Sequence, residues 1–182
     1  MTLLILGLVL WTAAHFFKRA LPGVRDGMGD AGKGVVAVAI LASVVLMVIG
    51  YRGWFADLAY NPPVWGVHLN NLLMLVAVFL FGLGSSKSPL RAKMRHPMLT
   101  GVIVWAIAHL LVNGDWASVV LFGGLAVWAL AEMVVINSRE PVYHRFEGGT
   151  IGGTVRLVVI SVVVFSVIAG IHTWLGYWPF PG

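Results

Sequence analysis

The chain has 182 residues, of which 59% are hydrophobic and only 10% are charged, and its mean hydropathy is +0.92. Soluble domains average about 25% charged residues, so this composition excludes a soluble globular domain and predicts an integral membrane protein in a lipid bilayer. The absence of cysteine excludes disulfides, thiolate ligands and iron–sulfur clusters. The net charge of +5 follows the membrane topology, and no nucleic-acid partner is expected.

Six segments approach the roughly 20 apolar residues that a transmembrane helix needs. In chain order they are residues 2–17, 34–51, 64–84, 97–112, 117–136 and 154–176. The first follows the initiator methionine without a basic stretch or a convincing cleavage site, so we expect a retained helix rather than a signal peptide. The predicted fold is therefore an all-α integral membrane bundle of about six transmembrane helices, forming a single domain over residues 1–182.

The basic residues are distributed unevenly between the loops. Eleven of the twelve lysines and arginines lie in or beside the first, third and fifth loops, and only Arg52 lies on the other side. Cytoplasmic loops carry such an excess of positive charge, so both termini are expected on the outer, periplasmic side. An aromatic belt is expected at the outer boundary, formed by Trp54, Trp65, Trp116, Trp174, Tyr177 and Trp178.

Six histidines are unusual in a chain with so few polar side chains. The topology places His15, His96 and His144 towards the cytoplasm and His68, His109 and His172 towards the outer side. Polar side chains inside the bilayer usually face the interior of the bundle. His109, which lies roughly 18 Å into its helix from Pro97 at 1.5 Å per residue, is therefore expected to be buried.

Helical spacing gives two of these histidines the same surroundings. His109 shares a helix face with Trp105 at i−4 and Gly101 at i−8, and His15 shares a face with Trp11 and Gly7 at the same spacings. Small residues would leave room for a flat ligand, and two imidazoles from two helices could hold a b-type haem. The alternative is that each histidine only hydrogen-bonds a neighbouring helix.

Other polar residues have simpler expected roles. Glu132 is expected to form an ion pair with Arg156 or Arg139, with proton handling or orientation of an imidazole as the alternative. Asn70 and Asn71 are expected to form hydrogen bonds between helices. His96, about 220° around the helix from His109, is expected at the membrane interface. The glycine run at residues 147–153 fits no phosphate-binding loop and predicts a flexible connector.

Four motifs in order resemble the NnrU family over essentially the whole chain: "AAHFFKRALPGVRD", "NPPVWGVHLNNLLMLVAVFLFG", "RHPMLTGVIVWAIAHLLVNGD" and "IHTWLGYWPF". The resemblance implies a multi-pass protein of the bacterial inner membrane, linked to denitrification and to nitrite and nitric oxide metabolism. "RHP" also resembles membrane methyltransferases of the isoprenylcysteine type, but "EPVYHRFEGG" matches their C-terminal segment poorly.

A relative of this family, the 15-cis-zeta-carotene isomerase, is a haem b enzyme. Carried over by motif, the resemblance implies His15 and His109 as the axial ligands. The isomerase has a cysteine three residues before its second histidine, whereas this chain has Ala106 there, which argues against ligand-switching chemistry. Since His15 is expected nearer the cytoplasm than His109, His68 and His172 are reserve partners for His109.

Three functions follow from these observations. The first is a haem b-binding membrane protein associated with denitrification, in which nitric oxide would bind the haem, with His15 and His109 as ligands beside Trp11, Gly101 and Trp105. The second is a haem-dependent isomerase of an apolar polyene such as zeta-carotene. The third is a haem-free assembly factor for a respiratory complex. The sequence leaves open whether the protein is an enzyme.

Overall fold

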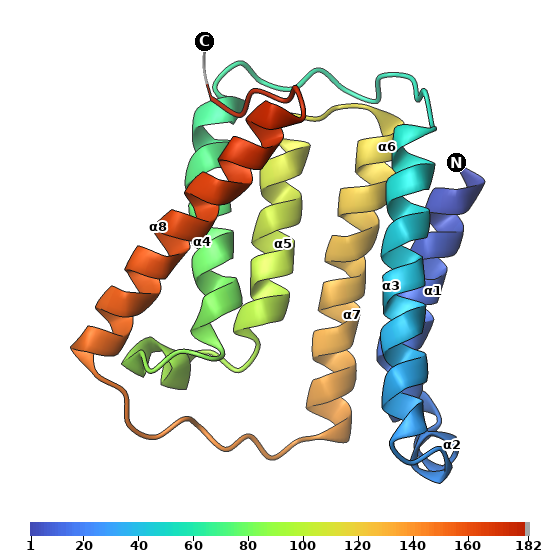
Figure 1. The fold of residues 1–182 in the computed structure, drawn as a ribbon, viewed down its shortest axis with the longest axis vertical. Helices are drawn as coiled ribbons and strands as arrows, with labels where there is room; N and C mark the ends of the chain where they lie inside the picture. Colours follow the sequence, from blue (N-terminus) through green and yellow to red (C-terminus); the bar gives the residue numbers. More distant parts are fainter. Residues whose placement is uncertain (181–182) are drawn as a thin grey trace.

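The computed structural model describes residues 1–180, and that part of the chain is all helical (Figure 1). The helices are α1 (Thr2–Ala20), α2 (Pro22–Gly27), α3 (Ala31–Arg52), α4 (Gly66–Leu83), α5 (Pro97–Leu110), α6 (Trp116–Ser118), α7 (Gly124–Arg139) and α8 (Ile151–Trp174). A 3-10 turn, η1 (Pro89–Lys93), precedes α5, and a π-helical turn, η2 (Val119–Gly123), joins α6 to α7.

Each of the six predicted spans corresponds to a helix. Five continuous helices are long and apolar enough to cross a membrane, with α6, η2 and α7 counting as one rod of 24 residues. The sixth, α5, has 14 residues, about 21 Å at 1.5 Å per residue, which is shorter than the roughly 30 Å hydrocarbon core. The prediction of a multi-pass helical membrane protein is confirmed.

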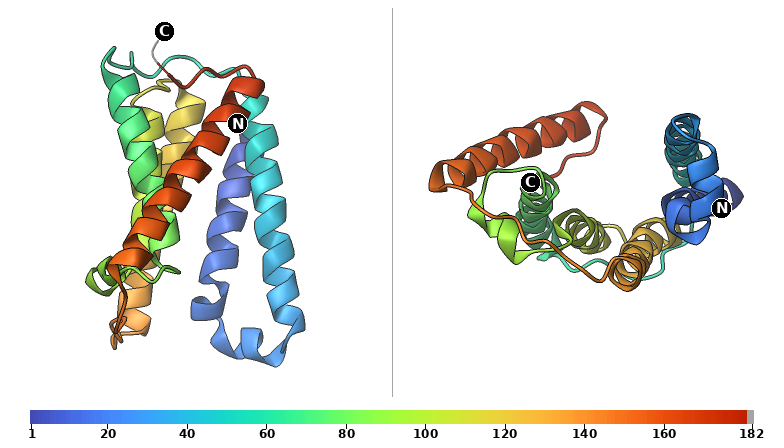
Figure 2. Two further views of the ribbon diagram at one scale, coloured as in Figure 1. Left: turned by 60° about the vertical axis from the view of Figure 1, so that its left-hand side comes forward. Right: turned by 90° about the horizontal axis from the view of Figure 1, so that it is seen from below.

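The helices are arranged as an open arc. Seen from below, the arc runs from α8 through α4, α5 and α7 to the pair α1 and α3 (Figure 2). Both ends of the described chain lie at the same end of the bundle (Figure 1), as six crossings require. The predicted cytoplasmic loops, which hold most of the basic residues, lie at the opposite end.

Glycines allow α1 and α3 to pack closely. A Cβ added to Gly7 would lie 2.7 Å from Met47 Cγ and 2.8 Å from the Met47 backbone nitrogen. A Cβ added to Gly50 would clash with the backbone of Leu4. The small residues of this helix pair therefore serve backbone approach, as is common between membrane helices.

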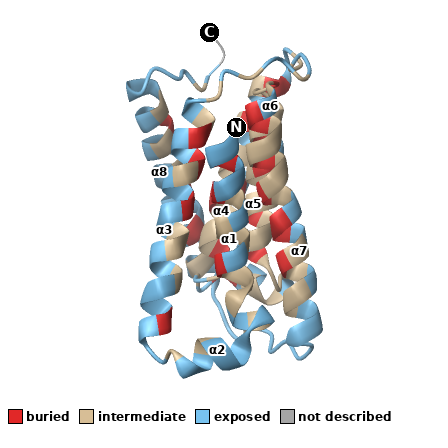
Figure 3. Ribbon diagram, turned by 90° about the vertical axis from the view of Figure 1, so that its right-hand side faces the viewer, coloured by how far each residue is buried: buried red, intermediate tan, exposed pale blue. Residues whose placement is uncertain are grey.

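The buried residues form narrow stripes along the helices, whereas most outward faces are exposed (Figure 3). One buried cluster joins α1, α3 and α7 and consists of Leu4, Met47, Leu125, Trp128 and Ala129. A second consists of Leu80, Leu83 and Leu157. Exposed valines and isoleucines on α3 and α8 are the surface that a bilayer would cover.

The structure corrects the expected glycine connector in its second half. Helix α8 begins at Ile151 and therefore includes Gly152 and Gly153. Thr150 is its N-cap, because Thr150 Oγ1 accepts a hydrogen bond of 2.9 Å from the Gly153 backbone nitrogen. Only Gly148 and Gly149, with φ of 101° and 98°, behave as turn residues.

Candidate functional site

Three intramembrane histidines share one local geometry. In each, ring Nδ1 lies within hydrogen-bond distance of the backbone carbonyl four residues earlier: His15 with Trp11 at 2.8 Å, His109 with Trp105 at 2.9 Å, and His172 with Ile168 at 2.8 Å. A carbonyl oxygen can only accept, so Nδ1 donates and carries the proton. In the neutral ring the lone pair is then on Nε2, which is the arrangement of a metal-ligating imidazole with an oriented second nitrogen.

His109 is held between aromatic rings. The Phe122 ring stacks on the imidazole with centroids 4.5 Å apart and an interplanar angle of 26°, and the Trp105 ring lies at 4.8 Å. Phe122 belongs to the π-helical turn η2 and is buried. Helix α5 and the turn η2 therefore fix the orientation of this imidazole together.

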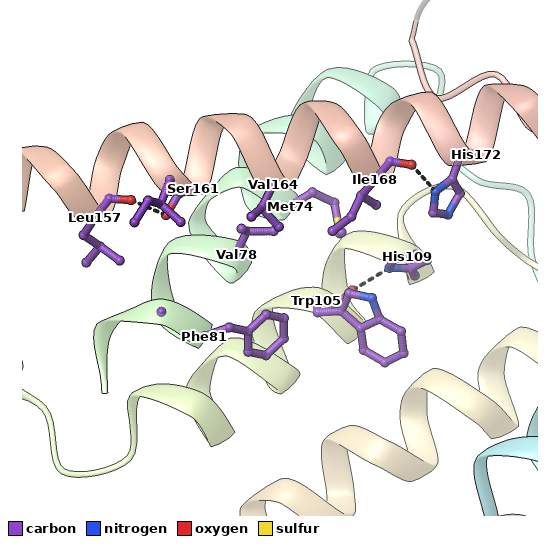
Figure 4. Close-up of a pocket in the computed structure, with 12 residues that line it drawn as sticks. Met74, Val78, Phe81, Trp105, His109, Leu157, Ser161, Val164, Ile168 and His172 are labelled. Carbon is purple, nitrogen blue, oxygen red and sulfur yellow. Dashed lines mark hydrogen bonds between the residues drawn. The ribbon is translucent and has the colours of Figure 1, made fainter. Parts of the chain in front are cut away.

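His109 also lines a cavity of about 420 Å³ between α4, α5 and α8 (Figure 4). His172 lies across from it on α8, near the outer end of the cavity. The other lining residues are Met74, Val78, Phe81, Gly82, Trp105, Leu157, Ile160, Ser161, Val164 and Ile168. Its metal-ligating groups are thus two imidazoles and the Met74 thioether, in walls that are otherwise almost entirely apolar.

His15 lies in a different aromatic cluster, between α1 and α7. Its ring centroid is 4.2 Å from that of Trp11 and 4.7 Å from that of Trp128. The Nε1 atoms of both tryptophans are buried without a hydrogen-bond partner in residues 1–180. Buried donors are rarely left unpaired, so these two N–H groups mark a place where an acceptor is missing.

The structure does not place His15 in the cavity that His109 and His172 line. His15 contacts Trp128 and His109 contacts Phe122, and both partners belong to the rod formed by η2 and α7. Six residues separate them, which corresponds to about 9 Å along the axis. The two imidazoles therefore differ less in depth than the sequence implied, but α7 lies between α1 and α5 (Figure 2).

The two glycines of the predicted site do not leave the room that was expected beside them. A Cβ on Gly101 would lie 2.8 Å from the Phe81 ring, and one on Gly7 would lie 2.7 Å from Met47. Protein side chains thus already fill both spaces. Gly101 contributes indirectly, because it lets Phe81 pack where it lines the cavity.

The remaining polar residues of the motifs lie outside the cavity. His68 is exposed on α4, so this reserve partner does not face His109's cavity. His96 is the N-cap residue of α5, and its Nε2 lies 2.8 Å from Asn137 Oδ1, which fits the predicted interfacial position. Asn70 Nδ2 donates to the Ala108 carbonyl at 2.8 Å, as expected of a hydrogen bond between helices.

The predicted ion pair of Glu132 with Arg156 or Arg139 is wrong. Glu132 is buried, and its Oε1 lies 2.7 Å from Arg19 Nη1, while Arg19 Nη2 lies 3.2 Å from Glu140. Glu132 is one turn beyond Trp128 on the face of α7 that packs on α1, where Arg19 is one turn beyond His15. His15 and Arg19 on one helix have the same i, i+4 spacing as Trp128 and Glu132 on the other. This shared spacing could have predicted the pairing of Arg19 with Glu132.

Three residues of the site were missed: Phe122, Trp128 and Met74. Their partners lie on helices distant in sequence, and the π-helical turn that positions Phe122 has no marker in the "VVLFGG" segment.

Within residues 1–180, no three His, Asp or Glu side chains gather to hold a bare metal ion. A haem iron needs only one or two imidazoles from the protein.

The fold and this site define a class: a polytopic helical membrane protein with an apolar intramembrane cavity that presents two oriented imidazoles. The sequence model of one family, described as NnrU protein, matches residues 3–179. The chain belongs to the NnrU family. Comparison with curated proteins and with solved structures gave no match.

Proposed function

We propose that the protein binds haem b within the membrane, with His109 as an axial ligand, and serves nitrite and nitric oxide metabolism in the bacterial inner membrane. The observation that carries this proposal is the shared cavity of His109 and His172. The association with denitrification is what membership of the NnrU family implies.

The residues present fit such a group. The Trp105 carbonyl holds Nδ1 of His109, so Nε2 is available as a ligand without any change of rotamer or tautomer. Apolar walls suit a largely hydrophobic macrocycle, and the volume of about 420 Å³ falls in the range of about 300–1,000 Å³ typical of small-molecule sites. Bound haem would supply an iron that takes up diatomic molecules or transfers single electrons.

Two imidazoles compete to be the second ligand. The family resemblance implies His15, which has the same tautomer and two unpaired indole donors beside it. The cavity favours His172, which already faces the space that His109 lines. The two assignments give different results in one experiment.

The test is the absorption spectrum of the detergent-purified full chain, expressed with ample haem and recorded oxidised and reduced. We expect a Soret band that is lost, or reduced at least tenfold in occupancy, in His109→Ala. Loss of the low-spin spectrum in His15→Ala but not His172→Ala assigns the pair to His15, and the opposite result assigns it to His172. His68→Ala, an exposed histidine outside the cavity, is the matched control and should leave the spectrum unchanged.

The alternatives give contrasting results. Absence of a Soret band in the wild-type protein would contradict haem binding and favour a haem-free assembly factor. Turnover of zeta-carotene would favour the isomerase. Ala106, which is fully buried, argues against it, because it replaces the isomerase cysteine with a side chain that cannot bind iron. A shift of the reduced spectrum on addition of nitric oxide supports the role in nitric oxide metabolism.

A further inference from the structure

A second cleft lies at the opposite, cytoplasmic end of the bundle from His172. It has a volume of about 190 Å³, and its walls come from the turn between α4 and α5 and from the linker between α7 and α8. The residues that define it are Arg91, Arg95, Tyr143, His144 and Phe146. The proposed haem site uses none of these side chains.

Aromatic rings of the linker position both arginines. The Arg91 guanidinium lies over the Phe146 ring at 4.5 Å, and that of Arg95 lies 5.4 Å from the Tyr143 ring centroid. A guanidinium stacked on an aromatic ring keeps its N–H groups in the plane free to bind an oxyanion. The stacking therefore orients the two cations without neutralising them.

Within the described part of the chain, no carboxylate forms an ion pair with either arginine. Among residues 1–180, the ion pairs within 4.0 Å involve Arg19 and Lys33, not Arg91 or Arg95. The nearby Glu140 directs its carboxylate to Arg19, and only its backbone carbonyl accepts a hydrogen bond from Arg95. The lining of the cleft thus holds two arginines with His144 beside them and, among residues 1–180, no aspartate or glutamate.

The two segments that form the cleft are fastened together. Tyr143 Oη donates to the Met94 carbonyl at 3.1 Å, and the Thr150 backbone nitrogen donates to the Lys87 carbonyl at 2.9 Å. Ser88 Oγ and Thr154 Oγ1 are 2.8 Å apart. These contacts hold the linker against the turn, so both arginines line one defined cleft beside the linker's aromatic rings.

The position of the cleft indicates its ligand. Gly84 and Pro97 also line it, so it lies where α4 ends and α5 begins, at the cytoplasmic boundary of the membrane. Pro97 is the first residue of α5, so the positive end of this helix dipole lies beside the cleft. We propose that this cleft, which we call the Arg91–Arg95 cleft, binds a phosphate group.

A phosphate at this depth has two sources: the headgroup of an anionic phospholipid and free phosphate from the cytoplasm. Basic pockets between helices on the cytoplasmic side are typical sites for anionic lipid headgroups. Met94 and Phe146 add apolar surface beside the arginines, which suits a lipid more than a free anion. The experiment distinguishes the two sources.

The test measures phosphate binding by the full chain, purified in a neutral detergent. Native mass spectrometry counts bound phosphatidylglycerol, with phosphatidylcholine as the zwitterionic comparison and inorganic phosphate as the competitor. We expect preferential retention of phosphatidylglycerol, which falls about tenfold or more in Arg91→Gln/Arg95→Gln because charge-assisted hydrogen bonds are lost. Competition by millimolar phosphate would assign the site to the free anion, and its failure assigns the site to the lipid.

Two further variants keep the result interpretable. Lys18→Gln/Arg139→Gln removes the same charge from exposed positions on the same side of the membrane and should bind phosphatidylglycerol as the wild type does. Arg91→Gln alone keeps the hydrogen bond from Arg95 to the Glu140 carbonyl, so the linker should stay in place. A partial loss of phosphatidylglycerol binding in this variant would therefore reflect the lost charge and not a misfolded linker. Equal retention of both lipids without phosphate binding, or unchanged binding by the double variant, would overturn the proposal. The Soret band is an independent readout of the haem site.

Discussion

Glycine positions decide how closely α1 and α3 approach, and one of them gives a clean test. In Gly50→Ala the new methyl group would meet the backbone of Leu4, which cannot move as a side chain can. Overpacking of this kind costs about 1–3 kcal/mol, so we expect the midpoint of thermal unfolding in detergent to fall by several degrees.

The matched control lies in the same helix. A Cβ on Gly34 meets nothing within 4 Å, and alanine is the better helix former, so Gly34→Ala should leave the midpoint unchanged or raise it slightly. Equal effects of both substitutions would contradict the close packing of α1 on α3.

For single residues, the sequence predicted the surroundings of each histidine within its own helix better than its partners on other helices. Spacing alone placed a tryptophan one turn before His15 and before His109, and the backbone carbonyls of those tryptophans hold Nδ1 in the structure. The sequence offered His172 only as a reserve partner of His109, because its place opposite His109 depends on how α8 packs against the other helices. A helical pattern gives the face of a residue but not the helix that this face meets.

Helices α1 and α7 meet along a stripe that passes from apolar to charged. Leu8 packs at Gly124, Trp11 and His15 at Trp128, and then Arg19 pairs with Glu132 towards the end of the bundle that holds the basic loops. The rings of Trp11 and Trp128 are 5.1 Å apart in a T-shaped arrangement. The Arg19–Glu132 ion pair therefore forms the charged end of this stripe.

Removing Arg19 should cost more than removing the charge of Glu132. Arg19→Met leaves a buried carboxylate without its cation, which typically costs about 3–5 kcal/mol, whereas Glu132→Gln leaves Arg19 its contact with Glu140. The double variant should be more stable than the sum of the single effects predicts, by at least about 1 kcal/mol. Chemical unfolding of the four proteins of this cycle measures that coupling.

The exposed pair Lys33 and Asp30 is the control for this cycle. Its side chains are 75% and 94% exposed, so neutralising either residue should change stability by less than about 1 kcal/mol. A coupling between Arg19 and Glu132 that is no larger than this would contradict a structural ion pair.

The π-helical turn η2 connects this stripe to the cavity. It carries Phe122, whose ring stacks on His109, whereas the α-helical part that follows presents Trp128 and Glu132 to α1. One rod therefore contacts both imidazoles that the family resemblance pairs. Local bulges of this kind are frequent at functional sites, and here the bulge sets which residues face α5 and which face α1.

For the whole molecule, composition and hydropathy were sufficient to predict the class and six apolar helices, five of which are long enough to cross a membrane. Hydropathy reports burial in lipid, which is a property of each segment by itself, and the confirmed spans follow from that. The open arc of Figure 2 could not be predicted, because it depends on pairwise packing between helices. The same reason explains why Glu132 was assigned the wrong arginine, since its partner Arg19 lies on α1, which is distant from α7 in sequence.

The orientation in the membrane can be tested without background, because the chain has no cysteine of its own. Asn61 is exposed in the loop after α3, and Ser138 is exposed at the opposite end of the bundle, in the last turn of α7. Because the basic loops lie at the Ser138 end, a membrane-impermeant maleimide should label Asn61→Cys in intact spheroplasts and Ser138→Cys only after lysis. The reverse pattern would invert the topology and place the Arg91–Arg95 cleft outside, where cytoplasmic phosphate could not reach it. Labelling of both variants before lysis would instead show a mixed orientation, which the strong charge asymmetry of the loops argues against.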